Sequence, residues 1–346
     1  MTLGQSTASR DFRIRTLLRI AALTAVSLLS QFGSTAFSQD RPKDPVALYW
    51  PWQPDIGIAG VELARLDGAF ARESIDLQLR TGLSEADTIK SVVSAPDAIG
   101  MISASQFLRA RADGAPIVAF AAGALDNGAA LYVAADSKIR APADFVGKSV
   151  GYESGDDTAA IYDIILNRAR LSRASIKEVP IRQAQPFSAA GIDVWPGYVG
   201  RTSLQLMSSS VPFRTLKPAD FGAHLLGTVY FASETTIQRR PELMRKFLNV
   251  LIDSWENAFG NFAVSVPRVM EVVAPGLDRA SVELLLNEER EILRPAGDRI
   301  GEFSQGRWTD TQNQLIQLRL LKRPVDLSKA VTFELLKDVY RRRAVR

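Results

Sequence analysis

The stretch that decides the fold is VALYWPWQPDIGIAGVELARLDGAFARESIDLQL, residues 46–79. Apolar residues dominate 46–50 and 75–79, which predicts two strands, and the sequence between them predicts a helix that ends at Gly68. A strand, a helix and a second strand in this order indicate an α/β sheet with parallel strands. Ligands bind to such sheets beyond the carboxyl ends of the strands. The loop at 50–55 follows the first strand, so we expect it to reach a ligand.

The side chains of this loop suit a flat, polar, nitrogen-rich ligand. The loop offers the indoles of Trp50 and Trp52, the amide of Gln53 and the carboxylate of Asp55. The alternative interpretation places both indoles in the hydrophobic core, because cores hold many more side chains than pockets do. We take Trp52, Gln53 and Asp55 as candidate ligand contacts.

Residues 1–38 have the layout of a secretory signal peptide. Four arginines precede an apolar run at 20–29, and the small residues Ala36 and Ser38 follow it. The run is too short to span a bilayer, which takes about 20 apolar residues. We expect cleavage after Ser38, with cleavage after Ala36 as the alternative.

The composition narrows the class of protein. The chain has 346 residues, 46% hydrophobic and 23% charged, and contains no cysteine, which excludes disulfides, thiolate catalysis and cysteine-bound metals. The leader holds four arginines and one aspartate, so its removal lowers the formal net charge from +4 to +1. The basic cluster at 341–346 is then best interpreted as a solvated tail. We expect a soluble periplasmic monomer that binds no nucleic acid and carries no metal or cofactor.

The order of the predicted elements indicates two lobes. Strands and helices alternate as far as residue 233, and amphipathic helices follow from residue 240. The chain is expected to cross between the lobes near 131–135 and near 226–232, and paired crossings of this kind act as hinges. The predicted architecture is a two-lobed α/β fold, each lobe a mostly parallel sheet flanked by helices. Lobe 1 takes residues 45–131 and 226–346, and lobe 2 takes residues 132–225.

Seven segments, in this order, carry a resemblance to a known family: WQPDIGIAG, LDGAFARESIDLQL, RARADGAPIVAFAA, KIRAPADFVGKSVGY, DVWPGYV, GTVYFASETTIQRRPELMRKFLNVLIDSWENAF and KRPVDLSKAVTFELL. From about Val46 to Tyr340 the chain resembles the type II periplasmic substrate-binding proteins of ABC importers. It is most similar to the branch of thiamine-pyrimidine precursor binders and fungal thiamine-pyrimidine synthases. The resemblance implies a small-molecule ligand between the lobes and, as partners, a permease and an ATPase at the inner membrane.

Three departures from the synthases favour a binding protein over an enzyme. Where the synthases have a histidine after their tryptophan–glutamine–proline loop, this chain has Ile58. The positions that match their pyridoxal-phosphate lysine and its neighbouring histidine are Ile102 and Gln106. The cysteine-rich, iron-binding stretch of the synthases matches Ala223, His224, Leu225 and Gly227. An aldimine requires an amine, and a single histidine does not make an iron site, so we expect no enzymatic activity.

Further candidate contacts in lobe 1 follow the strand that is predicted to end near 101–103. Ser103, Ser105 and Gln106 stand at the start of the next helix. Their hydroxyl and amide groups both donate and accept hydrogen bonds, as recognition of heterocycle nitrogens requires. The alternative is that Ser103 or Ser105 only caps the helix.

In lobe 2 the candidates surround a predicted helix start. They are Glu153, Ser154, Gly155, Asp156 and Thr158. A helix N-terminus attracts anions, but Glu153, Asp156 and Asp157 already crowd this one with negative charge. A phosphate or sulfonate would be repelled, which favours a neutral or cationic ligand. The alternative is that an aspartate merely caps the helix.

Three aromatic residues, Trp195, Tyr198 and Tyr230, complete the candidate set. Trp195 is expected just past the end of a strand, where an indole stacks on a ligand. The predicted protein is a periplasmic receptor that closes around a thiamine-related pyrimidine and delivers it to an importer. A flavin or an alkanesulfonate is the next ligand class, and presentation of the ligand to a membrane sensor kinase is the alternative to transport.

Overall fold

The computed structural model describes residues 43–345 apart from 154–156, 182–190, 209–211 and 296. The predicted signal peptide and the candidates Ser154, Gly155 and Asp156 lie outside the described residues. Residues 43–346 form one unit by their contacts. Within the described ranges, no helix is both long and apolar enough to cross a membrane.

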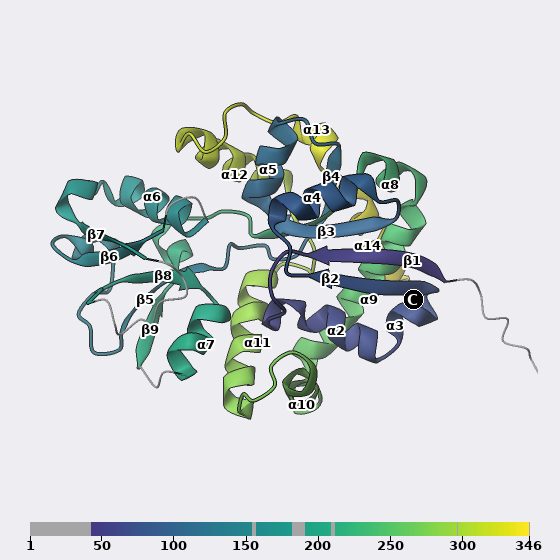
Figure 1. The fold of residues 1–346 in the computed structure, drawn as a ribbon, viewed down its shortest axis with the longest axis horizontal. Helices are drawn as coiled ribbons and strands as arrows, with labels where there is room; N and C mark the ends of the chain where they lie inside the picture. The colour runs from purple at the N-terminus through teal and green to yellow at the C-terminus, as the bar shows by residue number, and fades with distance from the viewer. Residues whose placement is uncertain (1–42, 154–156, 182–190, 209–211, 296, 346) are drawn as a thin grey trace, which may run out of the picture. The chain divides into compact units, whose positions relative to one another are not determined.

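The first sheet contains both strands that were predicted in the segment at 46–79. β1 (Asp44–Trp50) buries every second residue and pairs in parallel with β2 (Ile75–Thr81) and β3 (Ala98–Ser103). β10 (Thr228–Ser233) returns from far along the chain and lies antiparallel between β3 and β4 (Ile117–Ala122). The order is β2-β1-β3-β10-β4 (Figure 1). Because β10 runs against β3, the sheet edge where β1 and β3 end is also the edge where β10 begins.

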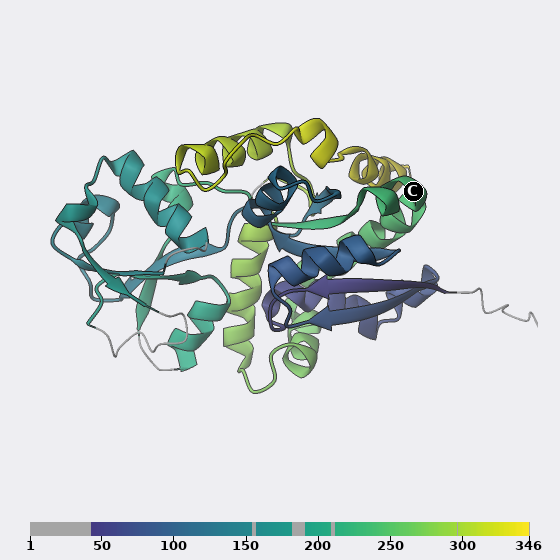
Figure 2. The same ribbon diagram turned by 45° about the horizontal axis from the view of Figure 1, so that its top comes forward.

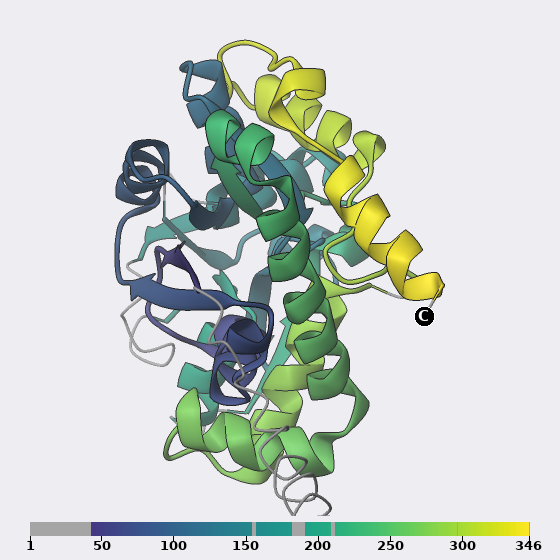
Figure 3. The ribbon, with the colours of Figure 1, turned by 90° about the vertical axis from the view of Figure 1, so that its right-hand side faces the viewer.

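Helices pack on both faces of this sheet. On one face, α2 (Ala59–Leu66) packs against the long helix α9 (Pro241–Gly260), and α14 (Glu334–Ala344) lies beside α9 (Figure 3). On the other face, α5 (Ala104–Ala112) packs against α12 (Gln305–Gln317) (Figure 2). The other helices of this part are α3 (Ala69–Arg72), α4 (Glu85–Ser94), α8 (Glu234–Arg239), α10 (Phe262–Val272), α11 (Arg279–Leu293) and α13 (Leu327–Ala330).

Large aromatic side chains fill the two layers between sheet and helices. Phe247 and Trp255 of α9 form the core of the first layer, and Phe107 and Trp308 meet in the second with ring centroids 5.4 Å apart. Consecutive strand residues point to opposite faces. Tyr230 of β10 therefore joins the first layer, and its neighbour on the strand joins the second.

The chain between residues 123 and 227 builds two smaller sheets. β5 (Ala129–Ala134) is flanked on both sides by antiparallel strands, β8 (Trp195–Tyr198) and β9 (Phe213–Leu216). β6 (Ser149–Tyr152) pairs in parallel with β7 (Lys177–Pro180). The described helices of this part are α6 (Asp157–Ala169) and α7 (Arg201–Ser208), with the 3-10 turns η2 (Pro142–Phe145), η3 (Arg173–Ser175) and η5 (Pro218–Phe221).

The α/β class predicted from the sequence is confirmed, with two differences in detail. β5 already belongs to the second part, so the chain leaves the first sheet between Ala122 and Ala129, earlier than the expected 131–135. The sheet around β5 is antiparallel rather than parallel. The limits of the two lobes stay a prediction.

Trp195 is the first residue of β8 and does not follow the end of a strand, contrary to the expectation. The proline that follows it suggested a loop, since proline cannot donate a ladder hydrogen bond. β8 is an edge strand, however, and edge strands tolerate proline. Pro196 stands opposite Leu131 in the ladder.

Candidate functional site

A cavity of about 370 Å³, which we call the strand-end cavity, opens at the edge of the first sheet where β1 and β3 end and β10 begins. Residues from both parts of the chain line it, as the α/β topology predicts. α11 closes one side, because it contacts the 3-10 turn η1 (Ile56–Ile58) as well as α7. The lining residues are Trp50, Trp52, Asp55, Gly57, Glu85, Met101, Ser103, Arg109, Gly123, Ala124, Asn127, Gly128, Asp157, Tyr198, Val199, Arg201, Gly227, Thr228, Glu289 and Ile292.

Two indoles form the aromatic wall of this cavity. The ring centroids of Trp50 and Trp52 lie 5.6 Å apart in an edge-to-face arrangement, with an interplanar angle of 83°. Trp50 ends β1 and is almost fully buried, whereas Trp52 is only partly buried. The indole N–H of Trp50 finds no acceptor among the described residues. Both alternatives for the indoles therefore apply: Trp50 packs in the core, and Trp52 offers its ring to the cavity.

Asp55 is held in place by the turn that follows it. Its Oδ1 accepts a hydrogen bond from the Gly57 N–H at 3.1 Å, which makes Asp55 the N-cap of η1. Burial raises the pKa of this carboxyl, and the nearby Arg201 guanidinium and the Gly57 N–H partly oppose the rise. A neutral carboxyl donates a hydrogen bond as well as accepting one.

A second carboxyl, Glu85, enters from the start of α4. Its Oε1 accepts a hydrogen bond from the Ser103 backbone N–H at 2.6 Å, which ties α4 to the end of β3. Burial raises the pKa of Glu85, and the Asp157 carboxylate adds to the rise. The Ser103 hydroxyl accepts the Gln106 N–H at 3.3 Å, so Ser103 both caps α5 and lines the cavity.

Glu289 of α11 is a deeply buried acid of the site, and like Asp157 it has 7% of its surface exposed. Burial, and then the Asp55 and Glu288 carboxylates, raise its pKa to about 8. Sequence reasoning missed this residue. The signal was present, however, because Glu289 falls on the apolar stripe formed by Leu285, Leu286 and Leu293. A carboxylate on such a stripe faces either the core or a cavity.

The other part of the chain contributes Tyr198, Asp157 and Arg201. Tyr198 ends β8, and its backbone N–H donates to the Thr202 hydroxyl at 3.0 Å. Asp157 begins α6 and accepts a hydrogen bond from the Asn127 amide at 2.8 Å. Within the described residues, neither Arg109 nor Arg201 makes an ion pair. These two guanidiniums are therefore the positive groups available to a ligand.

Four of the predicted contacts line this cavity: Trp52, Asp55, Ser103 and Tyr198. Gln53 is exposed beside Gly82, where its amide nitrogen lies 3.1 Å from the place that a Cβ of Gly82 would take. Ser105 is fully buried. Gln106 uses its amide oxygen to accept a hydrogen bond from the Arg109 Nε at 3.0 Å.

The remaining predicted contacts lie away from the cavity walls. Trp195 is 3% exposed and packs with Tyr132 and Leu206, and Tyr230 is buried in the first core layer. Thr158 is buried near the start of α6, and one carboxylate oxygen of Glu153 is buried without a partner among the described residues. Their roles as ligand contacts stay predictions.

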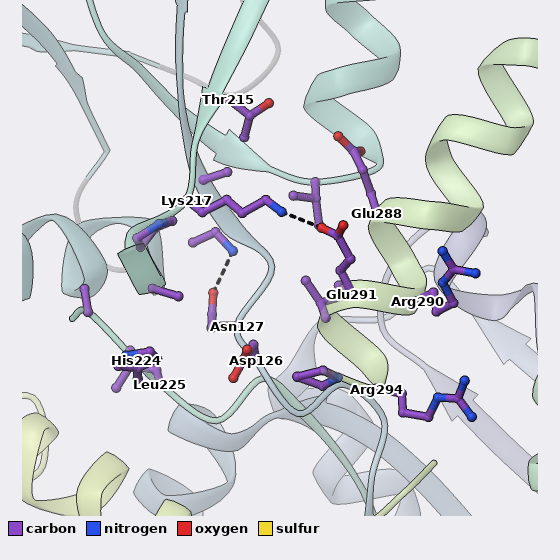
Figure 4. A pocket seen from close by; sticks show the side chains of 18 of the residues that line it. Asp126, Asn127, Thr215, Lys217, His224, Leu225, Glu288, Arg290, Glu291 and Arg294 are labelled. Atoms are coloured by element: carbon purple, nitrogen blue, oxygen red, sulfur yellow. Dashed lines mark hydrogen bonds and ion pairs between the residues drawn. The ribbon is translucent and has the colours of Figure 1, made fainter. Parts of the chain in front are cut away.

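A larger cavity of about 760 Å³ shares the lining residues Asn127, Val199 and Ile292 with the strand-end cavity (Figure 4). Its polar walls carry both signs of charge, and Lys217 reaches across to Glu291 of α11 with the Nζ and Oε2 atoms 2.5 Å apart. His224, the single histidine of the sequence, lines this cavity. Among the described residues, no cluster of three potential metal ligands occurs.

Comparison with known proteins agrees with this geometry. The family model described as "NMT1/THI5 like" matches residues 55–261, which is more than half of the chain. No curated protein matches the sequence.

Several solved structures have the same fold at low identity. The periplasmic aliphatic sulphonate binding protein SsuA from Escherichia coli is 15% identical, with a TM-score of 0.66 over 84% of this chain and 92% of its own. A putative periplasmic sulfonate-binding protein SsuA from Methylobacillus flagellatus is 13% identical, with a TM-score of 0.68 over 88% and 96% of the two chains. The C27S mutant of DSZB, in complex with biphenyl-2-sulfinic acid, is 17% identical, with a TM-score of 0.59 over 86% and 99%. The chain thus has the fold of the periplasmic binding proteins and belongs to the NMT1/THI5-like family.

Proposed function

We propose that this protein is the periplasmic solute-binding component of an ABC importer. It binds a small molecule in the strand-end cavity and presents it to a permease driven by an ATPase. Three features support this function: the family, the fold it shares with periplasmic binding proteins, and a cavity lined from both parts of the chain. Export through the segment at 1–38 is part of the same proposal.

The charge of the cavity supports a flat heterocycle that carries amino groups or a protonated nitrogen, as thiamine-related pyrimidines do. Four carboxyl groups line it against two guanidiniums, and the partly buried indole of Trp52 offers a stacking surface. Carboxyl groups accept hydrogen bonds from amino groups and attract cations. The single observation that carries the ligand class is this excess of acids: Asp55, Glu85, Asp157 and Glu289 against Arg109 and Arg201.

An alkanesulfonate is the second candidate ligand, because Arg109 and Arg201 make no ion pair with any described residue and two similar structures are named as sulfonate-binding proteins. An anion, however, meets three carboxyls whose pKa values are raised by burial, so its binding would need protons as well. A flavin is a further candidate. Presentation of the ligand to a membrane sensor kinase is the alternative to delivery to a permease.

We propose no enzymatic activity, although DSZB, a desulfurization enzyme, has the same fold. The sequence has no cysteine, and its single histidine lines the other cavity, away from the aromatic wall. In the described residues the strand-end cavity therefore lacks a histidine or thiol that would serve as base or nucleophile.

A thermal-shift screen of aminopyrimidines, flavins and sulfonates tests the ligand class, with intrinsic tryptophan fluorescence as a second readout. Ligand that binds the folded state raises its melting temperature. We expect aminopyrimidines to stabilise the protein and to change the emission of Trp52. Stabilisation by sulfonates alone would show that the acid excess does not decide the ligand.

A further inference from the structure

The strongest feature that the proposed function leaves unexplained is the pairing of Asp55 and Glu289 at Gly57. A Cβ placed on Gly57 would lie 3.2 Å from the Asp55 Oδ1, 3.6 Å from the Glu289 Oε1 and 3.6 Å from the Trp50 Cζ2. Two carboxyls and an indole edge therefore meet around one glycine on the cavity wall. Only a residue without a side chain keeps the space between them open.

Among the residues that the structure describes, none is a hydrogen-bond or ion-pair partner of the Glu289 carboxylate. It is 7% exposed and lines the cavity, yet within the described residues its carboxylate accepts no hydrogen bond and makes no ion pair. Burying a carboxylate without a partner costs several kcal/mol, so such a group is retained where a ligand or a proton satisfies it. Glu289 is thus an acceptor that the folded chain holds ready for a group that enters the cavity.

We propose that Asp55 and Glu289 act together as the specificity-determining site for a planar N–C–N edge, such as an amidine or an aminopyrimidine, and share one proton while the cavity is empty. The inference rests on the proposed function as a solute-binding protein and names the chemical group that the site recognises. A cationic edge places its N–H donors on the two carboxylates and displaces the shared proton to solvent. A neutral aminopyrimidine donates its amino N–H to one carboxyl and accepts the shared proton at the ring nitrogen, so no proton leaves.

The charged groups around the pair agree with a shared proton. Glu288 on the same helix adds negative charge at Glu289, and it is itself engaged by the Gly200 N–H and the Ser203 hydroxyl, each at 3.1 Å. Arg201 of α7 acts on Asp55 but makes no ion pair with it among the described residues. Tyr230 of β10 also interacts with Glu289, and it is neutral because burial raises its pKa. Among the described residues, neither carboxyl makes an ion pair, so the shared proton is what lowers the charge of the pair from −2 to −1.

Isothermal titration calorimetry with three matched probes tests the proposal: benzamidine, benzamide and benzenesulfonate. These share a flat ring for Trp52 and differ in the charge of the edge. In two buffers of different ionisation enthalpy at neutral pH, benzamidine is expected to bind with release of about one proton, because the carboxyl pair holds one shared proton when empty and none when it binds the cation. 4-Aminopyrimidine is expected to bind without proton release.

The Glu289→Gln variant is expected to bind benzamidine at least about tenfold more weakly, since a hydrogen bond to a charged group is lost, and to release no proton. Asp55→Asn is also expected to weaken benzamidine binding and to reduce proton release. Agreement between the two variants would show that the effect is not a folding defect of one of them. Glu283→Gln is the matched control, because Glu283 lies on the same helix but pairs with Arg279 at 2.7 Å on the surface. A cooperative thermal unfolding transition identifies the variants that are folded.

Equal affinity for benzamidine and benzamide, or an unchanged benzamidine affinity in Glu289→Gln, would overturn the carboxyl-pair site and leave the binding function standing. Preference for benzenesulfonate would overturn it in favour of an anion site at Arg109 and Arg201. Failure of all four probes to bind would overturn both this site and the flat-heterocycle ligand class.

Discussion

At the scale of single residues, Trp52 and Trp195 were both predicted to stack on the ligand, and the structure places them differently. Trp52 lines the cavity and is partly buried, whereas Trp195 is enclosed beside Tyr132. Trp52→Ala is expected to weaken the binding of a flat ligand by about 1–3 kcal/mol, by analogy with stacking on bases. Trp195→Ala is expected to lower the free energy of unfolding by about 3–5 kcal/mol, because it leaves a large core cavity.

Titration calorimetry and urea unfolding of both variants separate the two roles. Each variant serves as the control for the other, since both remove one indole. A folded Trp195→Ala protein with weakened binding would return Trp195 to the ligand site, and unchanged affinity in Trp52→Ala would place the ligand elsewhere.

The buried acid on α11 predicts a pH dependence of stability. The pKa of Glu289 is about 8 in the folded protein, above the ordinary glutamate value of 4.5 that applies to the unfolded chain. The folded state therefore binds the proton more tightly, and stability falls as the pH rises from about 4.5 through 8. Glu289→Gln is expected to remove roughly 2–5 kcal/mol of this fall.

Urea unfolding of the wild type and of Glu289→Gln across this pH range measures the difference. Asp55, Glu85 and Glu288 also have raised pKa values, so the variant keeps a shallower decline in the same direction. Parallel stability curves for the two proteins would show that Glu289 does not carry a proton in the folded state.

At the scale of elements, the packing of α2 on α9 depends on one glycine. A Cβ on Gly60 would lie 2.5 Å from the Trp255 Cε2, too close for a real contact. Gly60→Ala is expected to lower the free energy of unfolding by about 1–3 kcal/mol, because forced overpacking outweighs the helix propensity of alanine. Gly260→Ala is the control: Gly260 ends α9, and a Cβ there meets nothing within 4 Å. Equal stability of the two variants in thermal unfolding would contradict this account.

The sequence predicts best those elements that have a clear periodicity of apolar residues or a clear terminating residue. β1 buries alternate residues, and α2 gives way near Gly68, which takes a positive φ of 63°. The edge strand β8 was harder, because Pro196 argues against a strand when the neighbours are unknown. Strand pairing decides such cases, and pairing is a property of the folded chain. The same reason explains why the chain leaves the first sheet before residue 129 and not at the expected 131–135. The sequence of β5 is equally compatible with the last strand of one sheet and with the central strand of another.

At the scale of the whole molecule, the site is harder to predict than the fold. Trp52 and Asp55 follow a strand and Ser103 ends one, so the rule for α/β sheets finds them. Glu85 and Glu289 come from the start of one helix and the middle of another, more than 200 residues away. Their convergence depends on how α4 and α11 pack, and no local pattern of the sequence contains that information. The excess of acidic residues at the site can therefore be recognised from the folded structure and not from the sequence alone.

The arrangement of the cavity predicts a change of shape on binding. Trp52 reaches it from the first sheet and Tyr198 from the second, while the chain passes between the two sheets at 123–128 and again at 222–227. A ligand that contacts both side chains stabilises the form in which they approach each other, and two adjacent connections allow that motion as a hinge. Small-angle X-ray scattering is expected to give a smaller radius of gyration with saturating aminopyrimidine than without it. Trp52→Ala at the same ligand concentration is expected to keep the larger value, because it loses the contact on one side. An identical radius for the free and saturated wild type would show that this protein binds its ligand without closing.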